Sequence, residues 1–160
     1  MNLGQFLANH WADLVGVAGL ALTIWAEFKA KTAAEQAREA SRQTTERLAT
    51  LDTLADLSAA IATMEEIKRL HRTGAWDIVL DRHSAVVRHL GRARATSPNL
   101  NNSQRADLDR SIAQFRMMEG TIESTVEVGG EIEIARLNSV VSKEIDATER
   151  ILSAIRRAGA

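Results

Sequence analysis

The pattern of apolar and polar positions separates an apolar N-terminal stretch from a polar middle and a series of amphipathic segments. Residues 6–28 are the most apolar part, and only Asp13 and Glu27 within them are charged. A helix of this length can cross a bilayer, although the uncharged run of 13 residues between the two acids spans only about 20 Å. The pattern therefore predicts a single transmembrane helix over residues 6–28. A helix that is buried in a protein core or lies at the membrane surface is the alternative.

The residues around this stretch predict its orientation. Trp11 and Trp25 bracket the apolar run, as expected for indoles at the headgroup boundaries. Lys29 and Lys31 follow the stretch, and no Lys or Arg precedes it. The positive-inside rule then places the N-terminus outside and the C-terminal domain in the cytoplasm, at a bacterial inner membrane. The missing basic n-region argues against a cleaved signal peptide.

Small side chains share one stripe of this helix, with an acidic residue beside them. Such a stripe allows two helices to approach closely in lipid. It predicts a transmembrane association face, which consists of Ala12, Gly16, Gly19, Thr23 and Asp13. Alternatively, the acidic side chains reach to the membrane surface, and the stripe only reflects an Ala- and Gly-rich composition.

The segment 29–50 is predicted to be a solvated helical stalk. Its apolar positions form only a weak stripe, made of Ala30, Ala33, Ala37, Ala40 and Leu48. No Gly or Pro lies between Gly19 and Gly74, which favours one long helix. The apolar positions slip in phase near Asp52 and Thr53, so a junction between two helices there is the alternative.

The segment 51–160 contains four amphipathic stretches, which predict an antiparallel cytoplasmic bundle of about four helices. Gly74 should end the first helix, and a loop over residues 96–103 should precede the third, capped by Asn102 or Ser103. The fold class is therefore all-α. The chain is predicted to consist of a membrane anchor at 1–28, a helical stalk at 29–50 and a bundle at 51–160.

Residues 126–134 are ambiguous, because apolar and polar residues alternate strictly around Gly129-Gly130. Alternation around a Gly-Gly pair is typical of a β-hairpin. Long helical patterns flank the segment on both sides, however, and an isolated two-stranded ribbon is only marginally stable. We therefore favour a turn between two helices.

Composition and motifs exclude several classes of chemistry. The 160 residues include no Cys, which rules out disulfides and Cys-ligated zinc. Twenty basic and 21 acidic residues give a net charge of −1, which argues against a general nucleic-acid binder. The chain has no phosphate-binding Gly loop, HExxH or GxSxG motif. We therefore predict no enzymatic activity, no cofactor and no metal. His71 and His83 fall on the core-side stripes of adjacent helices, where structural histidines are favoured over metal ligands.

Charge is unevenly distributed along the predicted bundle. Residues 68–94 hold seven bases and two acids, a local charge of +5, whereas residues 119–133 hold five Glu and no base. The two runs could complement each other within the fold or between subunits. A sharper interpretation is an anion site, for example for a nucleotide, because Arg suits phosphate. Its candidate residues are Lys68, Arg69, Arg72, Arg88 and Arg92.

Two functions are compatible with these patterns. The first is a membrane-anchored helical interaction or scaffold module that forms a homo-oligomer and binds an unidentified protein partner. The second is a ligand-gated membrane effector, in which an anion bound by the basic helical hairpin drives the transmembrane helices to assemble into a leak or pore.

Overall fold

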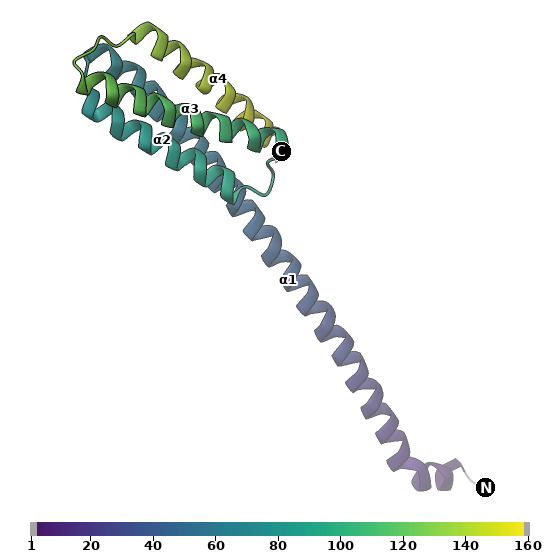
Figure 1. Ribbon diagram of the computed structural model, residues 1–160. Coiled ribbons are helices and arrows are strands. Elements are labelled where there is room, and N and C mark those ends of the chain that lie inside the picture. Colours follow the sequence, from purple (N-terminus) through teal and green to yellow (C-terminus); the bar gives the residue numbers. More distant parts are fainter. Residues whose placement is uncertain (1–2, 159–160) are drawn as a thin grey trace. The chain divides into compact units, whose positions relative to one another are not determined.

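The computed structural model describes the backbone of residues 3–158 and, within the first 34 residues, the side chains of only Trp25, Lys29 and Lys31. The described residues form four helices and no strand, so the predicted all-α class is confirmed (Figure 1). The helices are α1 (Leu3–Thr73), α2 (Trp76–Thr96), α3 (Asn102–Glu127) and α4 (Ile134–Ala158).

The chain divides into two compact units. The first, Met1–Thr45, contains the N-terminal part of α1, and the second, Glu46–Ala160, contains the rest of α1 with α2, α3 and α4. Every side chain from residue 35 to residue 48 is exposed. The second unit is a helical bundle, as predicted for the C-terminal part of the chain.

The predicted transmembrane anchor is not supported. Across the residues that the structure describes, no helix combines the length with the apolar content that a bilayer crossing needs. The physical reason is visible in the sequence, because Asp13 and Glu27 limit the uncharged run to 13 residues. That run spans about 20 Å of helix against a hydrocarbon core of about 30 Å. The predicted single-pass location in the inner membrane is therefore wrong.

The predicted association face of the N-terminal helix cannot be followed in the structure. The side chains of Ala12, Asp13, Gly16, Gly19 and Thr23 lie outside the described residues.

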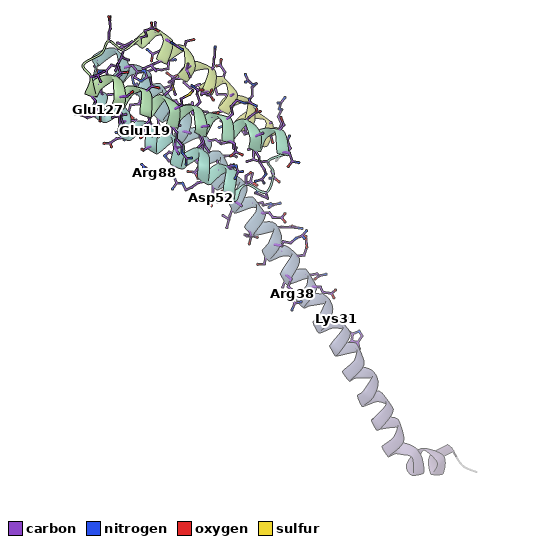
Figure 2. The ribbon with its side chains drawn as sticks, in the orientation of Figure 1. Lys31, Arg38, Asp52, Arg88, Glu119 and Glu127 are labelled. Carbon is purple, nitrogen blue, oxygen red and sulfur yellow. The ribbon has the colours of Figure 1, made fainter. Side chains whose placement is uncertain are left out.

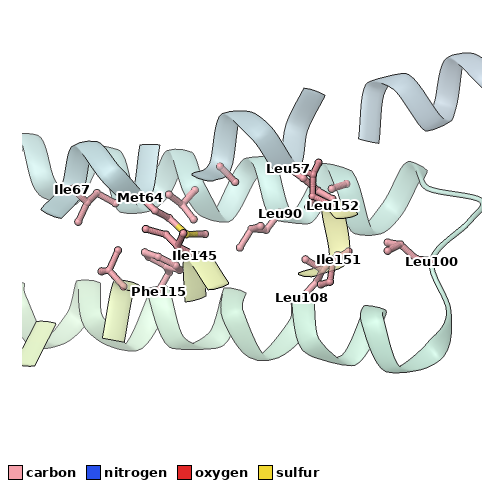
Figure 3. Packing of buried hydrophobic residues seen from close by; sticks show 14 of the residues in the cluster. Leu57, Met64, Ile67, Leu90, Leu100, Leu108, Phe115, Ile145, Ile151 and Leu152 are labelled. Atoms are coloured by element: carbon pink, nitrogen blue, oxygen red, sulfur yellow. The ribbon is translucent and has the colours of Figure 1, made fainter. Parts of the chain in front are cut away.

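The core of the bundle is built from one apolar stripe on each helix (Figure 3). Its fully buried members recur every three or four residues along α1, as an amphipathic helix requires. In α1 they are Leu57, Ala60, Met64 and Ile67. Leu90 of α2, Phe115 of α3 and Ile155 of α4 belong to the same cluster. Burial of these side chains holds the bundle together, at roughly 1.5–3 kcal/mol for each large one.

The helix α1 runs without interruption through Asp52 and Thr53, where a junction had been the alternative. Thr53 is buried, and its hydroxyl donates to the backbone oxygen of Ala49 at 2.8 Å. Leu48 and Leu51 are exposed, whereas the leucines that follow them contact the core. The slip in phase therefore marks the place where α1 begins to pack in the core.

The helices α1 and α2 form an antiparallel hairpin. Gly74 connects them with a φ of 66°, the left-handed conformation that glycine adopts without strain. Arg82 pairs with Glu66 at 3.1 Å, and Arg92 pairs with Asp56 at 2.8 Å. In these two ion pairs, the higher residue number on α2 is paired with the lower one on α1, so the helices are antiparallel. The predicted hairpin is therefore confirmed.

A short loop of residues 97–101 connects α2 to α3 and is fixed by one side chain. The Arg105 guanidinium donates to the backbone oxygens of Arg94 and Ser97, both at 2.8 Å, and of Leu100 at 3.3 Å. These bonds satisfy carbonyl groups that no helical amide reaches.

The capping residue of α3 differs from the prediction. Asn101, rather than Asn102 or Ser103, caps the helix: its side-chain oxygen accepts from the Gln104 amide at 2.8 Å. The Gln104 side chain accepts from the Asn101 amide at 2.9 Å and completes a capping box.

Residues 128–133 connect α3 to α4 without forming a strand. Gly129 has a φ of 66°, and the Gly130 amide donates to the Thr125 oxygen at 2.9 Å. These features are typical of a glycine that ends a helix. The predicted helix-to-helix turn is confirmed, and the β-hairpin alternative is wrong.

Candidate functional site

A groove lies between α3 and α4, next to the segment that connects them. Its volume is about 420 Å³. Apolar side chains from both helices and from the connecting segment line it, namely Met117, Met118, Ile122, Ile132, Leu137 and Val140. Met117 is 60% exposed, so part of this apolar lining is in contact with solvent.

The backbone around Gly129 and Gly130 shapes one end of the groove. A Cβ atom at Gly130 would lie 3.0 Å from the Thr125 side chain, so this position favours a residue without one. The Ile134 amide donates to the Ile132 oxygen at 2.9 Å as the chain turns into α4. The backbone of this connecting segment places Glu131, Ile132 and Glu133 in the lining of the groove.

The surroundings of the groove are acidic. Glu131 and Glu133 belong to its lining, whereas Glu123 and Glu127 are exposed on α3 outside the lining. Figure 2 shows Glu127 near the end of α3 that leads into the connecting segment. Arg136 is the one basic residue of the lining, and its guanidinium lies 3.9 Å from the Glu133 carboxylate. The groove therefore combines an apolar interior with a negatively charged border.

The sequence analysis did not identify this groove. Ile132 lies in the segment 126–134, whose pattern is ambiguous. The two adjacent methionines, Met117 and Met118, were the available signal, because one of two consecutive helical residues must lie off the core-facing stripe.

A second polar feature is buried near the turn between α1 and α2, where two histidines meet. The rings of His71 on α1 and His83 on α2 lie 6.1 Å apart between centroids, and both side chains are fully buried. Nδ1 of His71 lies 2.8 Å from Oδ1 of Asn138 on α4, so Nδ1 carries the hydrogen and donates it. The two histidines, which the sequence places on core-side stripes of adjacent helices, approach each other across the hairpin.

The imidazole nitrogens of this pair are poorly satisfied. Nε2 of His71 and both ring nitrogens of His83 have no hydrogen-bond partner. The His83 ring instead packs edge-on against Phe115 at 5.3 Å. Burial lowers the pKa of His83 to about 4, partly opposed by the Phe115 backbone and reinforced by His71. Burial also lowers the pKa of His71, and the hydrogen bond with Asn138 opposes that shift. Both imidazoles are therefore neutral near pH 7.

The histidine pair lacks further metal ligands. Within the described part of the chain, no three side chains of His, Cys, Asp or Glu are grouped so that they could hold a metal ion. Asn138 and the aromatic rings of Trp76 and Phe115 are the neighbours of the pair. The arrangement provides a buried polar contact among three helices rather than a reactive centre.

The structure places the residues of the predicted anion site along two helices without gathering them. Lys68 lies 3.6 Å from Glu65, and Arg92 pairs with Asp56, beside His89. Arg69 and Arg72 on α1 and Arg88 on α2 are exposed and make no ion pair with any described residue.

The register of the α1–α2 hairpin separates these arginines. Its ion pairs join Glu66 to Arg82 and Asp56 to Arg92, so Arg88 lies opposite the part of α1 between those two acids. That part of α1 is roughly 13 Å from Arg69 along the helix. The anion site remains a prediction, and no contact among its five residues supports it.

Comparisons with known proteins add no assignment to this geometry. No protein-family model, curated protein or solved structure matches the chain.

Proposed function

We propose that this protein is a non-enzymatic interaction module that pairs with a second copy of itself through the outer face of α1. The observation that supports the proposal is the exposure of two large apolar side chains on this helix. Leu48 is 56% exposed and Leu51 is 60% exposed, although they adjoin the part of α1 that packs in the core. Exposed leucines three residues apart on a helix are typical of a surface that another helix covers.

The exposed face has the spacing of a coiled-coil seam. Leu48, Leu51, Ala55 and Ala62 are all exposed and are separated by steps of three, four and seven residues. With Leu48 at position a, Leu51 occupies position d, and the two alanines repeat position a in the next two heptads. Leucines at the first two positions would supply most of the buried area. The small side chains of Ala55 and Ala62 would allow the two helices to remain in close contact over the next two heptads.

Charges on either side of the leucines favour a parallel arrangement of two copies. Arg47 occupies position g and Asp52 the next position e, and both are exposed. In a parallel two-stranded coil, a g residue lies opposite the e residue five positions later on the partner helix. Arg47 of each copy would therefore face Asp52 of the other, and the two-fold symmetry makes this ion pair twice. Neither side chain makes an ion pair with a described residue of its own chain.

Sedimentation velocity of the full chain tests the proposal. We expect the wild type to form a dimer. Leu48→Glu with Leu51→Glu should raise its dissociation constant by at least ~100-fold, because four leucines per dimer lose their burial. The matched control is Ile78→Glu with Val128→Glu, which charges two other exposed apolar positions and should leave the dimer intact.

A charge exchange tests the parallel geometry separately. Arg47→Asp alone and Asp52→Arg alone should each weaken the dimer, because like charges would face each other twice. The double variant should restore it. A monomeric wild type, or a dimer that survives the two glutamates, would contradict the proposed function.

A further inference from the structure

We propose that the α3–α4 groove binds an amphipathic helix of another protein, one that carries Lys or Arg beside a row of large apolar side chains. This site lies on different helices from the pairing face of α1 and does not depend on it. The proposal follows from the apolar lining of the groove, from unpaired carboxylates at its border and from the absence of a matching basic face on the described part of this chain.

The interior of the groove suits the apolar anchors of a helix. Met117, Met118 and Ile122 supply one wall from α3, and Leu137 and Val140 supply the other from α4. A helix that enters such a groove inserts side chains spaced by three or four residues, which lie on one of its faces. Methionine has a flexible, polarisable side chain, so the wall of α3 can adapt to anchors of different shape.

The border of the groove attracts cations. Glu131 belongs to its lining, is exposed and makes no ion pair with any residue that the structure describes. Glu133 is only loosely paired with Arg136, at 3.9 Å. Basic side chains that flank the apolar anchors of an incoming helix would therefore meet these two carboxylates.

The basic residues of the segment 68–94 do not neutralise the acidic residues of the segment 119–133. Their ion pairs to other helices all go elsewhere: Arg82 to Glu66, Arg92 to Asp56 and Arg94 to Asp109. The arginines without such a pair lie on α1 and α2, whose apolar stripes are already packed in the core. Apart from the α1 face assigned above to pairing, no described helix of this chain offers a free face that is both apolar and basic. This favours another protein over a second copy as the occupant.

The probe for the test is a labelled synthetic peptide of Leu and Lys, about four helical turns long, with leucines at helical spacing. We expect the full-length protein to raise its fluorescence anisotropy, and we expect added salt to weaken the binding. A peptide with Glu in place of each Lys should bind at least ~10-fold more weakly. Equal binding of the two peptides would overturn the proposal.

A matched pair of variants locates the binding. Thr121→Arg places a long cation in the lining of the groove, whereas Ala113→Arg adds the same charge at an exposed position of α3 outside the lining. We expect Thr121→Arg to weaken binding of the Lys peptide at least ~10-fold and Ala113→Arg to change it far less. Equal losses of affinity in the two variants would mean that the peptide responds only to the overall charge of the protein, and the proposal would fail.

The carboxylates can be tested in the same way. Glu131→Gln with Glu133→Gln removes two charges in the lining, and Asp146→Asn with Glu149→Gln removes two exposed acids on α4 outside it. Only the first pair should weaken binding and reduce its dependence on salt. Circular dichroism should show the same helix content in all variants, so that a loss of binding is not a loss of fold.

Self-association provides the last discriminating measurement. If the groove held a second copy, Thr121→Arg would abolish a dimer that Leu48→Glu with Leu51→Glu leaves intact, and the proposal of a different protein would be overturned. If Leu48→Glu with Leu51→Glu removes the dimer and still binds the Lys peptide as the wild type does, the groove proposal is supported.

Discussion

Protonation of His83 opposes folding, because its imidazole is fully buried and neither ring nitrogen has a partner. Burial lowers the pKa of His83 from 6.5 to about 4 in the folded protein. The folded state therefore keeps this imidazole neutral in a range where the unfolded chain binds a proton. The associated stability is fully present above about pH 6.5 and is lost as the pH falls towards 4.

The first prediction concerns this loss. Between pH 7 and pH 4, His83 should account for a fall of roughly 3 kcal/mol in the free energy of unfolding. His83→Leu should remove this part of the pH dependence, as measured by urea unfolding at several pH values. At pH 7 the variant should be at least as stable as the wild type, because it removes two unsatisfied buried nitrogens. His89→Gln is the control, since His89 is only partly buried. An unchanged acid response in His83→Leu would contradict the prediction.

The approach of the two buried histidines was predictable from sequence, whereas their hydrogen bonding was not. His71 and His83 both lie on apolar stripes of adjacent helices, and a hairpin brings such stripes together. The bond from His71 to Asn138 depends on the register of α4 against α1. Helical periodicity alone does not determine the register of α4 against α1.

At the scale of single elements, the connection after α3 depends on its two glycines. Gly129 has a φ of 66°, where a Cβ atom adds strain. Gly120, within α3, has helical geometry, and a Cβ atom there would meet open space.

The second prediction uses these two positions. Gly129→Ala should lower the free energy of unfolding by about 1–2 kcal/mol through left-handed strain. Gly120→Ala should raise it by about 0.5–1 kcal/mol, because alanine is the better helix former. Thermal or urea unfolding measures both. A stabilising effect of Gly129→Ala would show that the backbone there is not left-handed.

The helices themselves were predictable because their apolar periodicity is long and regular. The cap of α3 was missed by one residue, since Asn101, Asn102 and Ser103 can all serve as caps and only the geometry of the chain selects one. The α3–α4 groove was missed for a different reason. It arises where two helices leave space between them, and no pattern within one helix specifies that space.

At the scale of the whole molecule, all the buried apolar side chains that the structure describes belong to the second unit. In the described part of the chain, the buried apolar residues run from Leu57 to Ile155. The first unit, Met1–Thr45, contributes none of them.

The third prediction follows from this distribution. A fragment of residues 46–160 should unfold cooperatively, with a melting temperature within about 5 °C of that of the full chain. A shorter fragment of residues 61–160 lacks Leu57 and Ala60 and should lose cooperative unfolding, because the core is opened. Near-UV circular dichroism during heating distinguishes the two. A 46–160 fragment without a cooperative transition would contradict the prediction.

The inner-membrane prediction failed at this same scale. Asp13 and Glu27 leave 13 uncharged residues between them, and a prediction of a span has to count the residues beyond both acids as apolar. The length of residues 6–28 favours a membrane span, whereas the interruption of their apolar run by two acids argues against one.

The indole of Trp76 lies 5.8 Å from the imidazole of His71, at the turn between α1 and α2. Separation of the two rings would change the surroundings of this indole and hence its emission, so this turn carries its own optical reporter. The chain has only three tryptophans and no tyrosine. With Trp11 and Trp25 replaced by Phe, the remaining emission would come from this end of the bundle alone. Opening of the hairpin could then be followed in real time without any attached dye.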